Sequence, residues 1–383
     1  MAGLIGGIAP YRGVNNRIIG TAEQDIIFGD PYTTGNIFGE FGVPEIGGPL
    51  SSGRGGNDQL DGGAGDDNIY GDAWEITADG QGGNDRLDGG LGFDLLRGDA
   101  ELMSGNARGG DDRLDGGLED DTLMGEATFM TDNARGGDDQ LFGGQGFDNL
   151  IGDGDQMGDF TQGGDDLLDG GKENDTLVGD ANAMTGSSQG GDDRLDSGSE
   201  DDQLFGDGGF MTDNARGGND RLDGGNGNDL LAGDAFGMEG SAEGANDRLY
   251  GGSGDDSLYG DAVQMFDHTR GGNDLLIGGT GNDQLWGDGE FFSSFVLGSP
   301  DQFLFAPGSG QDTIGDFGLG MDVILIDRGY GYANFADLQA NISDDANGNA
   351  IVHLNGTVDQ VTLLGVHAAD LTAANFGFMG LSA

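Results

Sequence analysis

Residues 62–70 read Gly-Gly-Ala-Gly-Asp-Asp-Asn-Ile-Tyr. Residues 251–259, Gly-Gly-Ser-Gly-Asp-Asp-Ser-Leu-Tyr, repeat the same order of residue types. Glycine accepts the positive φ of tight turns. An apolar residue two positions after the aspartate is typical of a short strand with one buried face. Each stretch therefore predicts a glycine turn followed by a short strand.

The chain repeats itself every 27 residues, and each repeat holds three nine-residue segments. Two of the three carry an aspartate followed two residues later by Leu or Ile, and we call these aspartates the first and second columns. Such a period predicts a stack of coils. The first column is Asp58, Asp85, Asp112, Asp139, Asp166, Asp193, Asp220, Asp247 and Asp274, with Asp301 in the same register. The second column is Asp67, Asp94, Asp121, Asp148, Asp175, Asp202, Asp229, Asp256 and Asp283.

The third segment has an apolar residue in place of the aspartate, which is methionine in seven of the nine copies. We interpret these methionines as core filler, because methionine packs adaptably. Four residues before each lies an acid, and these acids form the third column. A turn-capping carboxylate is our preferred interpretation of this column, and a third row of Ca²⁺ ligands stays open. The third column is Asp72, Asp99, Glu126, Asp153, Asp180, Asp207, Asp234, Asp261 and Asp288.

Composition excludes several classes of protein. The formal net charge of −55 argues against nucleic acid and against anionic membrane surfaces, since both are bound by Lys and Arg. A chain with this charge and 84 glycines is typical of disorder, but the strict period of its acids argues for a fold. No stretch approaches the length of a transmembrane helix, so no membrane insertion is expected.

On these motifs the chain resembles the RTX, or haemolysin-type calcium-binding, family, whose repeat alternates Gly-Gly-x-Gly-x-Asp with apolar residues. Residues 62–70 and 251–259 match every defining position, and the resemblance covers about residues 53–288 with an outlying copy at 20–28. It implies an all-β fold, a parallel β-roll or β-helix solenoid of about nine 27-residue coils. It also implies Ca²⁺ as the cofactor, held in ladders between the coils.

The physics of Ca²⁺ supports that implication. The ion takes six to eight oxygen ligands, which turn carbonyls and carboxylates can supply. Carboxylates stacked about 4.8 Å apart repel by about 1 kcal/mol per pair even in bulk water. We therefore predict that both aspartate columns bind Ca²⁺ in the gaps between coils, roughly sixteen ions in all. Without Ca²⁺ the repulsion and the chain entropy should leave the protein unfolded.

The period also predicts the length of one coil. A coil of two segments would place methionine regularly in a Ca²⁺ column, whereas a 27-residue coil stacks like on like. We therefore expect Met103 beside Met130 and Met157, in a coil that is either three-sided or a roll with one long side. Weaker or altered sites are expected where the motif departs from its pattern, at Phe93, Phe147, Glu119, Glu173 and Glu200.

Three regions are expected: an N-terminal arm or cap at 1–50, the repeat array at 51–288, and a C-terminal β cap with a secretion signal at 289–383. Residues 310–317 and 320–325 are similar to the C-terminal cap of serralysin-type RTX proteins. Residues 370–378 resemble the uncleaved C-terminal signal of type I secretion substrates. The first ten residues lack a basic segment and a long apolar segment, so a Sec-type signal is not expected. The expected partner is the type I secretion machinery, and the expected location is extracellular or at the cell surface.

Catalytic motifs are missing from the sequence. It contains no His-Glu-x-x-His, no Gly-x-Ser-x-Gly and no cysteine. No carboxylate pair stands apart from the columns, so we expect no catalytic residues and no enzyme.

The leading functional hypothesis is a structural protein of the cell surface or extracellular matrix that folds on Ca²⁺ and self-assembles into a filament or layer. The open ends of a solenoid invite pairing with another copy. An adhesin or an ice- or surface-binding module is one alternative, although its Thr-x-Asn pattern, as at Thr131 and Asn133, is interrupted at Gly158 and Phe160. An accessory module that helps a secreted enzyme fold is the other.

Overall fold

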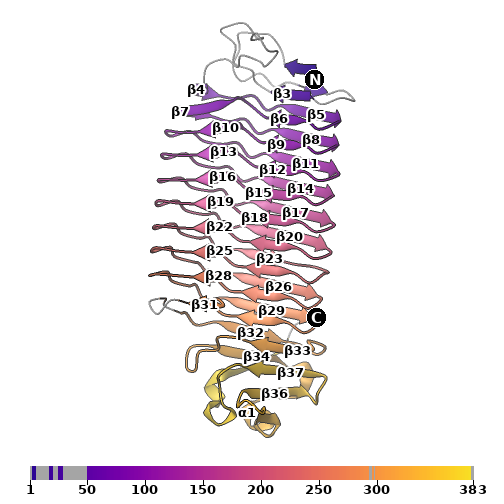
Figure 1. The fold of residues 1–383 in the computed structure, drawn as a ribbon, viewed down its shortest axis with the longest axis vertical. Coiled ribbons are helices and arrows are strands. Elements are labelled where there is room, and N and C mark those ends of the chain that lie inside the picture. The colour runs from indigo at the N-terminus through magenta and orange to yellow at the C-terminus, as the bar shows by residue number, and fades with distance from the viewer. Residues whose placement is uncertain are drawn as a thin grey trace. The chain divides into compact units, whose positions relative to one another are not determined.

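The computed structural model describes residues 2–5, 17–19, 25–28, 50–292, 296 and 298–380. They form two compact units, residues 1–197 with 207–209, and residues 198–206 with 210–383. Each unit is a stack of coils made of short strands and glycine turns (Figure 1). Among the described residues, none of the helices has the length and apolar character needed to cross a membrane.

The first sheet contains the strands that follow the first aspartate column. Its strands in the N-terminal unit are β2 (Arg17–Ile19), β5 (Gln59–Ala64), β8 (Arg86–Leu91), β11 (Arg113–Leu118), β14 (Gln140–Gln145) and β17 (Leu167–Lys172). Those in the C-terminal unit are β23 (Arg221–Asp223), β26 (Arg248–Ser253), β29 (Leu275–Thr280), β32 (Gln302–Phe305), β34 (Val323–Asp327) and β38 (Phe376–Met379).

The second sheet contains the strands that follow the second aspartate column. Its strands in the N-terminal unit are β1 (Ala2–Ile5), β3 (Asp25–Phe28), β6 (Asn68–Tyr70), β9 (Leu95–Arg97), β12 (Thr122–Met124), β15 (Asn149–Ile151) and β18 (Thr176–Val178). Those in the C-terminal unit are β21 (Gln203–Phe205), β24 (Leu230–Ala232), β27 (Ser257–Tyr259), β30 (Gln284–Trp286), β33 (Gln311–Ile314), β37 (Asp359–Leu363), β36 (Ala350–Asn355) and β35 (Ile342–Asp344).

The third sheet is built from the methionine segments. Its strands in the N-terminal unit are β4 (Leu50–Arg54), β7 (Glu75–Gln81), β10 (Ala100–Met103), β13 (Ala127–Met130), β16 (Gly154–Met157) and β19 (Ala181–Met184). The C-terminal unit has β25 (Ala235–Met238), β28 (Ala262–Met265) and β31 (Phe291–Phe292). Two strands, β20 (Arg194–Ser199) and β22 (Gly208–Met211), contain residues of both units.

One coil is 27 residues long, as the period predicts. The strands of β10 and β13 pair in parallel with Met103 opposite Met130, and β13 and β16 pair with Met130 opposite Met157. In the first sheet Leu114 lies opposite Leu141. Like therefore stacks on like, because every residue of one coil lies beside the residue 27 positions later.

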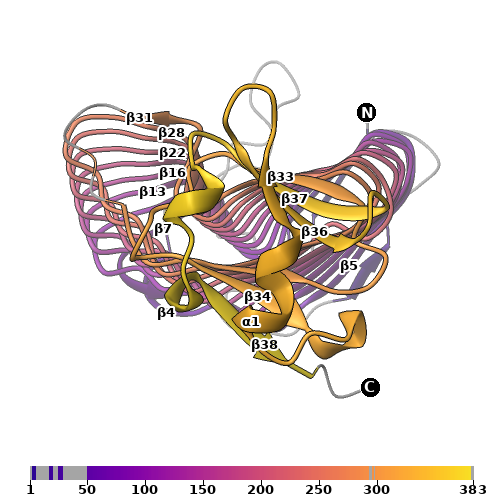
Figure 2. The same ribbon diagram turned by 90° about the horizontal axis from the view of Figure 1, so that it is seen from below.

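The core of each coil is filled by the aliphatic residues that follow the aspartates and by the methionine column. Leu114, Leu123 and Met130 are fully buried in one coil of the N-terminal unit. The same burial holds for the methionine column from Met103 to Met265, which confirms that methionine fills the core. Figure 2 looks along the strands' stacking direction and shows the third-sheet strands gathered on one side of the coil, away from β5.

The ends of the array also carry strands. In the N-terminal unit β2 pairs with β5, and β3 pairs with β6 so that Ile27 lies opposite Ile69. The copy of the motif at 20–28 therefore ends in a strand that stacks on the first full coil. In the C-terminal unit β35, β36 and β37 pair antiparallel. The helix α1 (Phe335–Leu338) and the short 3-10 turns at Arg328–Tyr330, Gln339–Asn341, Ala368–Asp370 and Ala373–Asn375 also belong to this region.

Candidate metal centre

The first aspartate column links each coil to the next through its carboxylates. The backbone amide of Asp85 donates a 2.6 Å hydrogen bond to Oδ1 of Asp112, and the amide of Asp112 donates one of 2.7 Å to Oδ1 of Asp139. The other carboxylate oxygen, Oδ2, of Asp112 and Asp139 is buried without a hydrogen-bond partner. One oxygen of each carboxylate is thus held by backbone, and the second is left for another ligand.

The second oxygen of the first column points at a glycine turn. A Cβ atom added to Gly98 would overlap Oδ2 of Asp112 and the carbonyl oxygen of Gly125. Glycine is therefore required here so that a carboxylate oxygen and a carbonyl oxygen can converge. This mixture of oxygens suits a hard cation such as Ca²⁺.

The second column repeats this geometry at a different turn. The amide of Asp94 donates a 2.8 Å hydrogen bond to Oδ1 of Asp121, whose Oδ2 is buried without a partner. A Cβ atom on Gly89 would lie 2.5 Å from Oδ2 of Asp94 and 2.7 Å from the carbonyl oxygen of Gly116. Carboxylate and carbonyl oxygens converge here too, so the two columns line two separate rows of oxygen-rich turns.

Burial disfavours the charged form of these carboxyl groups. Loss of solvent is the main cause that raises the pKa of Asp94 to about 6 and that of Asp121 to about 8, and the neighbouring carboxylates of the column add to it. The backbone hydrogen bond to each group opposes the shift. A cation between the carboxylates would remove the repulsion and restore the ionised form.

The third column caps turns, as the sequence predicts. Each acid accepts a hydrogen bond from the backbone amide eleven residues later, for example Asp99 from Gly110 at 3.1 Å and Asp153 from Gly164 at 3.2 Å. Glu126 accepts from Gly137 in the same way. The two ends of the methionine segment are therefore joined, and this segment forms a side loop on the coil.

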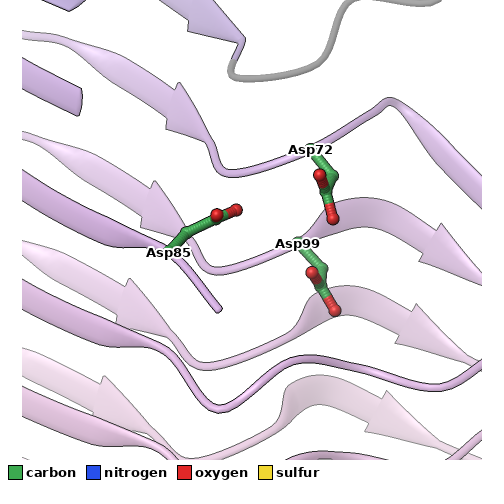
Figure 3. Close-up of side chains that lie close together, drawn as sticks. All are labelled: Asp72, Asp85 and Asp99. Atoms are coloured by element: carbon green, nitrogen blue, oxygen red, sulfur yellow. The ribbon is translucent and has the colours of Figure 1, made fainter. Parts of the chain in front are cut away.

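That closure brings the third column to the first. Carboxylate oxygens of Asp72, Asp85 and Asp99 all lie within 4.8 Å of one another, and Figure 3 shows the three side chains converging between neighbouring coils. Oxygens of Asp99, Asp112 and Glu126 form a second such group. All five residues are buried. The sequence spacing did not show that these two columns meet.

Electrostatics at these clusters are unfavourable in the absence of a cation. Burial first, and repulsion between neighbouring carboxylates second, raise the pKa values of Asp99, Asp112 and Glu126 well above the ordinary range. An ionised carboxylate in such surroundings needs a counter-charge. The clusters therefore fit a divalent cation bound by oxygens.

Glutamates that replace a turn glycine keep the glycine conformation. Glu119, Glu173 and Glu200 have φ of 73°, 68° and 81°, a region that glycine normally occupies. The side chain of Glu119 accepts a 3.0 Å hydrogen bond from the amide of Gly92 in the preceding coil. The turn is thus preserved at these positions. That their Ca²⁺ sites are weaker or altered stays a prediction, as it does for Phe93 and Phe147, which are largely exposed.

Each of the eighteen predicted ligands is buried, with at most 4% of its surface exposed. Sequence reasoning did not find that the columns continue into the C-terminal region. The amide of Asp274 donates to Asp301 at 3.0 Å, and the amide of Asp301 donates to Asp322 at 3.1 Å. The amide of Asp283 donates to Asp312 at 3.1 Å.

A signal for these further residues is present in the sequence. Asp312 and Asp322 are each followed two residues later by a buried isoleucine, as in the repeats. They escape a count in steps of 27 because their coils have other lengths, 29 residues from Asp283 to Asp312 and 21 residues from Asp301 to Asp322.

Comparison with known proteins bears on this centre. The family model described as the RTX calcium-binding nonapeptide repeat (4 copies) matches residues 52–73, 77–100, 106–127, 133–156, 160–183, 188–210, 214–236, 241–262 and 268–289. These segments amount to more than half of the chain. A search of curated proteins found no match.

Proposed function

Because the chain belongs to the RTX calcium-binding nonapeptide repeat family and binds Ca²⁺, we propose that it is a secreted structural protein of the cell surface or extracellular matrix. It folds when it meets Ca²⁺ outside the cell and assembles into a filament or layer. The ligands are the first and second aspartate columns. No residue is assigned a catalytic role.

One observation carries the proposal: the columns bury carboxylate oxygens that lack a protein donor. Examples are Oδ2 of Asp112 and Asp139 in the first column and Oδ2 of Asp121 in the second. A buried carboxylate without a partner is strongly destabilising, and a bound cation turns that penalty into binding energy. Because the ions bind only the coiled state, their binding free energy becomes folding free energy.

Two features support a site of action outside the cell. Extracellular calcium modules work with dissociation constants of about 10⁻⁴ to 10⁻³ M, so they fill where Ca²⁺ is plentiful. A chain that stays unfolded until that point remains suitable for export through a narrow channel. Residues 370–378, which resemble a type I secretion signal, fit this route.

A structural role follows from the extent of the repeats. The matched segments run from residue 52 to residue 289, and the coils they form have cores filled by their own aliphatic and methionine columns. Sheets of such coils end in edge strands, which offer backbone groups for pairing with another copy. Among the described residues the first and third sheets end on β2 and β4 in the N-terminal unit and on β38 and β31 in the C-terminal unit.

Circular dichroism and electron microscopy test the proposal together. The full-length chain in excess chelator at pH 7.5 should give the spectrum of a disordered chain, and millimolar Ca²⁺ should restore the β signal. Mg²⁺ at the same concentration is the control, because it demands octahedral geometry and retains its waters. Filaments or layers should form only with Ca²⁺. An unchanged β signal in chelator would contradict Ca²⁺-dependent folding, and a folded monomer in Ca²⁺ would contradict assembly alone.

A further inference from the structure

The third acidic column lies beside the first column in the N-terminal unit. Asp99 takes part in two groups of carboxylates, one with Asp72 and Asp85 and one with Asp112 and Glu126, each within 4.8 Å. Figure 3 shows the first group, in which Asp72 and Asp99 come from neighbouring coils and Asp85 faces them. First-column and third-column acids therefore alternate along one row.

The chain path explains why these columns meet. Asp99 begins the methionine segment, and its Oδ2 accepts a hydrogen bond from the amide of Gly110 at the other end of that segment. Asp112 follows Gly110 by two residues. Closing the side loop therefore places the acid that opens it against the aspartate that follows it.

Capping does not use up the third-column carboxylates. Oδ2 of Asp99 accepts from Gly110, while its Oδ1 is buried without a partner. Glu126 has the same arrangement, with Oε1 on Gly137 and Oε2 unpartnered. Oδ2 of Asp112 is likewise buried and unpartnered. Each group thus presents several buried anionic oxygens to one small volume.

We propose that the third column supplies half of the carboxylate ligands of the first ladder, so that each Ca²⁺ in that row is shared by acids of both columns. This inference rests on the proposed Ca²⁺ ladders. Each coil then contributes two carboxylates, for example those of Asp85 and Asp99, for every ion.

Charge balance distinguishes the two ladders. Two carboxylates per coil carry the charge that one Ca²⁺ neutralises, so the row built from the first and third columns is neutral when full. The second column contributes one carboxylate per coil, and its row gains positive charge as it fills. Ca²⁺ affinity depends on the charge count of the ligands. The row with two acids per coil should therefore bind Ca²⁺ more tightly and fill first.

Asparagine separates ligation from capping. An Asn side chain at position 99 keeps an oxygen that can accept from the Gly110 amide, but it loses the negative charge and one carboxylate oxygen. Asp88, which lies in the same repeat on the exposed side of β8, offers a matched control for the loss of one charge. Asp112→Asn serves as the comparison for a first-column ligand.

The experiment measures Ca²⁺ bound per full-length chain by equilibrium dialysis, together with the Ca²⁺ concentration at half-folding by circular dichroism. We expect Asp99→Asn to lose about one to two ions and to need severalfold more Ca²⁺, as Asp112→Asn does. Asp88→Asn should match the unmodified protein. Asp72→Asn, at the start of the column, should lose about one ion with the other coils still folded, which keeps the test decisive if Asp99→Asn cannot fold.

The possible results are distinguishable. If Asp112→Asn loses ions while Asp99→Asn and Asp72→Asn bind as the unmodified chain does, the third column only caps turns and this inference is wrong. If the unmodified chain neither binds Ca²⁺ nor folds with it, the proposed function itself is wrong. If Asp72→Asn loses an ion and Asp88→Asn does not, the third column is a ligand.

Discussion

The backbone amide of Asp112 donates a 2.7 Å hydrogen bond to Oδ1 of Asp139, which lies one coil further along the chain. Each first-column carboxylate thus binds the backbone of the coil before it with one oxygen and keeps the other, Oδ2, for an ion. An aspartate in the column therefore joins neighbouring coils both directly and through its ion. This double connection makes its contribution depend on its place in the array.

An alanine substitution in the middle of the first column should cost more than one at its start. Asp166 accepts from the amide of Asp139 and borders a gap on either side. Asp58 has no first-column aspartate before it. Because repeat stability is a sum over neighbouring coils, Asp166→Ala should lose more bound Ca²⁺ and show the larger drop in melting temperature than Asp58→Ala. Dialysis and thermal melts in Ca²⁺ measure both, and equal losses for the two variants would argue against shared ligation.

The methionine column should contribute core stability independent of the ions. Met157 is fully buried in the third sheet. Met157→Ala should lower the free energy of unfolding in saturating Ca²⁺ by about 2–5 kcal/mol, because it leaves a cavity. Its neighbour Gln156 is exposed, so Gln156→Ala is the matched control and should change little. Denaturant unfolding in Ca²⁺ gives both values. A Met157→Ala variant as stable as the control would show that the side loop does not need its core.

The sequence predicts the coil but not all of the site, for a physical reason. A strict period requires like residues to stack, so the 27-residue coil, the buried Leu columns and the pairing of Met103 with Met130 follow from spacing alone. Which turns of one coil approach each other depends on how the methionine segment closes. The contact of Asp99 with Asp112 therefore needed the structure. Asp322 needed it too, because its coil is not 27 residues long.

Close stacking of turns should make one glycine of the N-terminal unit irreplaceable. A Cβ atom on Gly137 would overlap the carbonyl oxygen of Gly110 in the preceding coil. Gly158 is the control, since a Cβ there meets nothing nearer than the Thr185 hydroxyl at 3.3 Å. Gly137→Ala should raise the Ca²⁺ concentration at half-folding severalfold or abolish folding, whereas Gly158→Ala should fold nearly as the unmodified chain does. Equal behaviour of the two in a Ca²⁺ titration would contradict such close packing.

The metal-free chain should regain β structure when acidified. Burial raises the pKa of Asp148 to about 6 and that of Asp121 to about 8, from about 3.9 in an unfolded chain. A carboxyl group with a raised pKa supports the folded state below its unfolded pKa, and this support is lost as the pH rises through 6 to 8. In chelator, the β signal in circular dichroism should therefore be stronger at pH 5 than at pH 8. The same protein in Ca²⁺ at pH 8 is the reference for full folding. A signal in chelator that does not change with pH would contradict the argument.

Assembly should depend on residues 1–50. In this region β2 and β3 continue the first and second sheets, and β1 adds a further parallel strand beside β3. We propose that this end joins the C-terminal region of another copy. A head-to-tail contact that does not close into a ring gives an open filament. Because carboxylate repulsion keeps copies apart until Ca²⁺ neutralises it, filaments should need Ca²⁺ as folding does.

Deleting residues 2–50 tests this proposal. The shortened chain keeps β5 and the coils that follow, so circular dichroism in Ca²⁺ should still show a folded protein. Light scattering and electron microscopy should find it monomeric, while the full chain forms filaments under the same conditions. Filaments as long as those of the full chain would place the contact elsewhere, because the deleted strands would then have no part in it. A full-length protein that stays monomeric in Ca²⁺ would contradict assembly through either end.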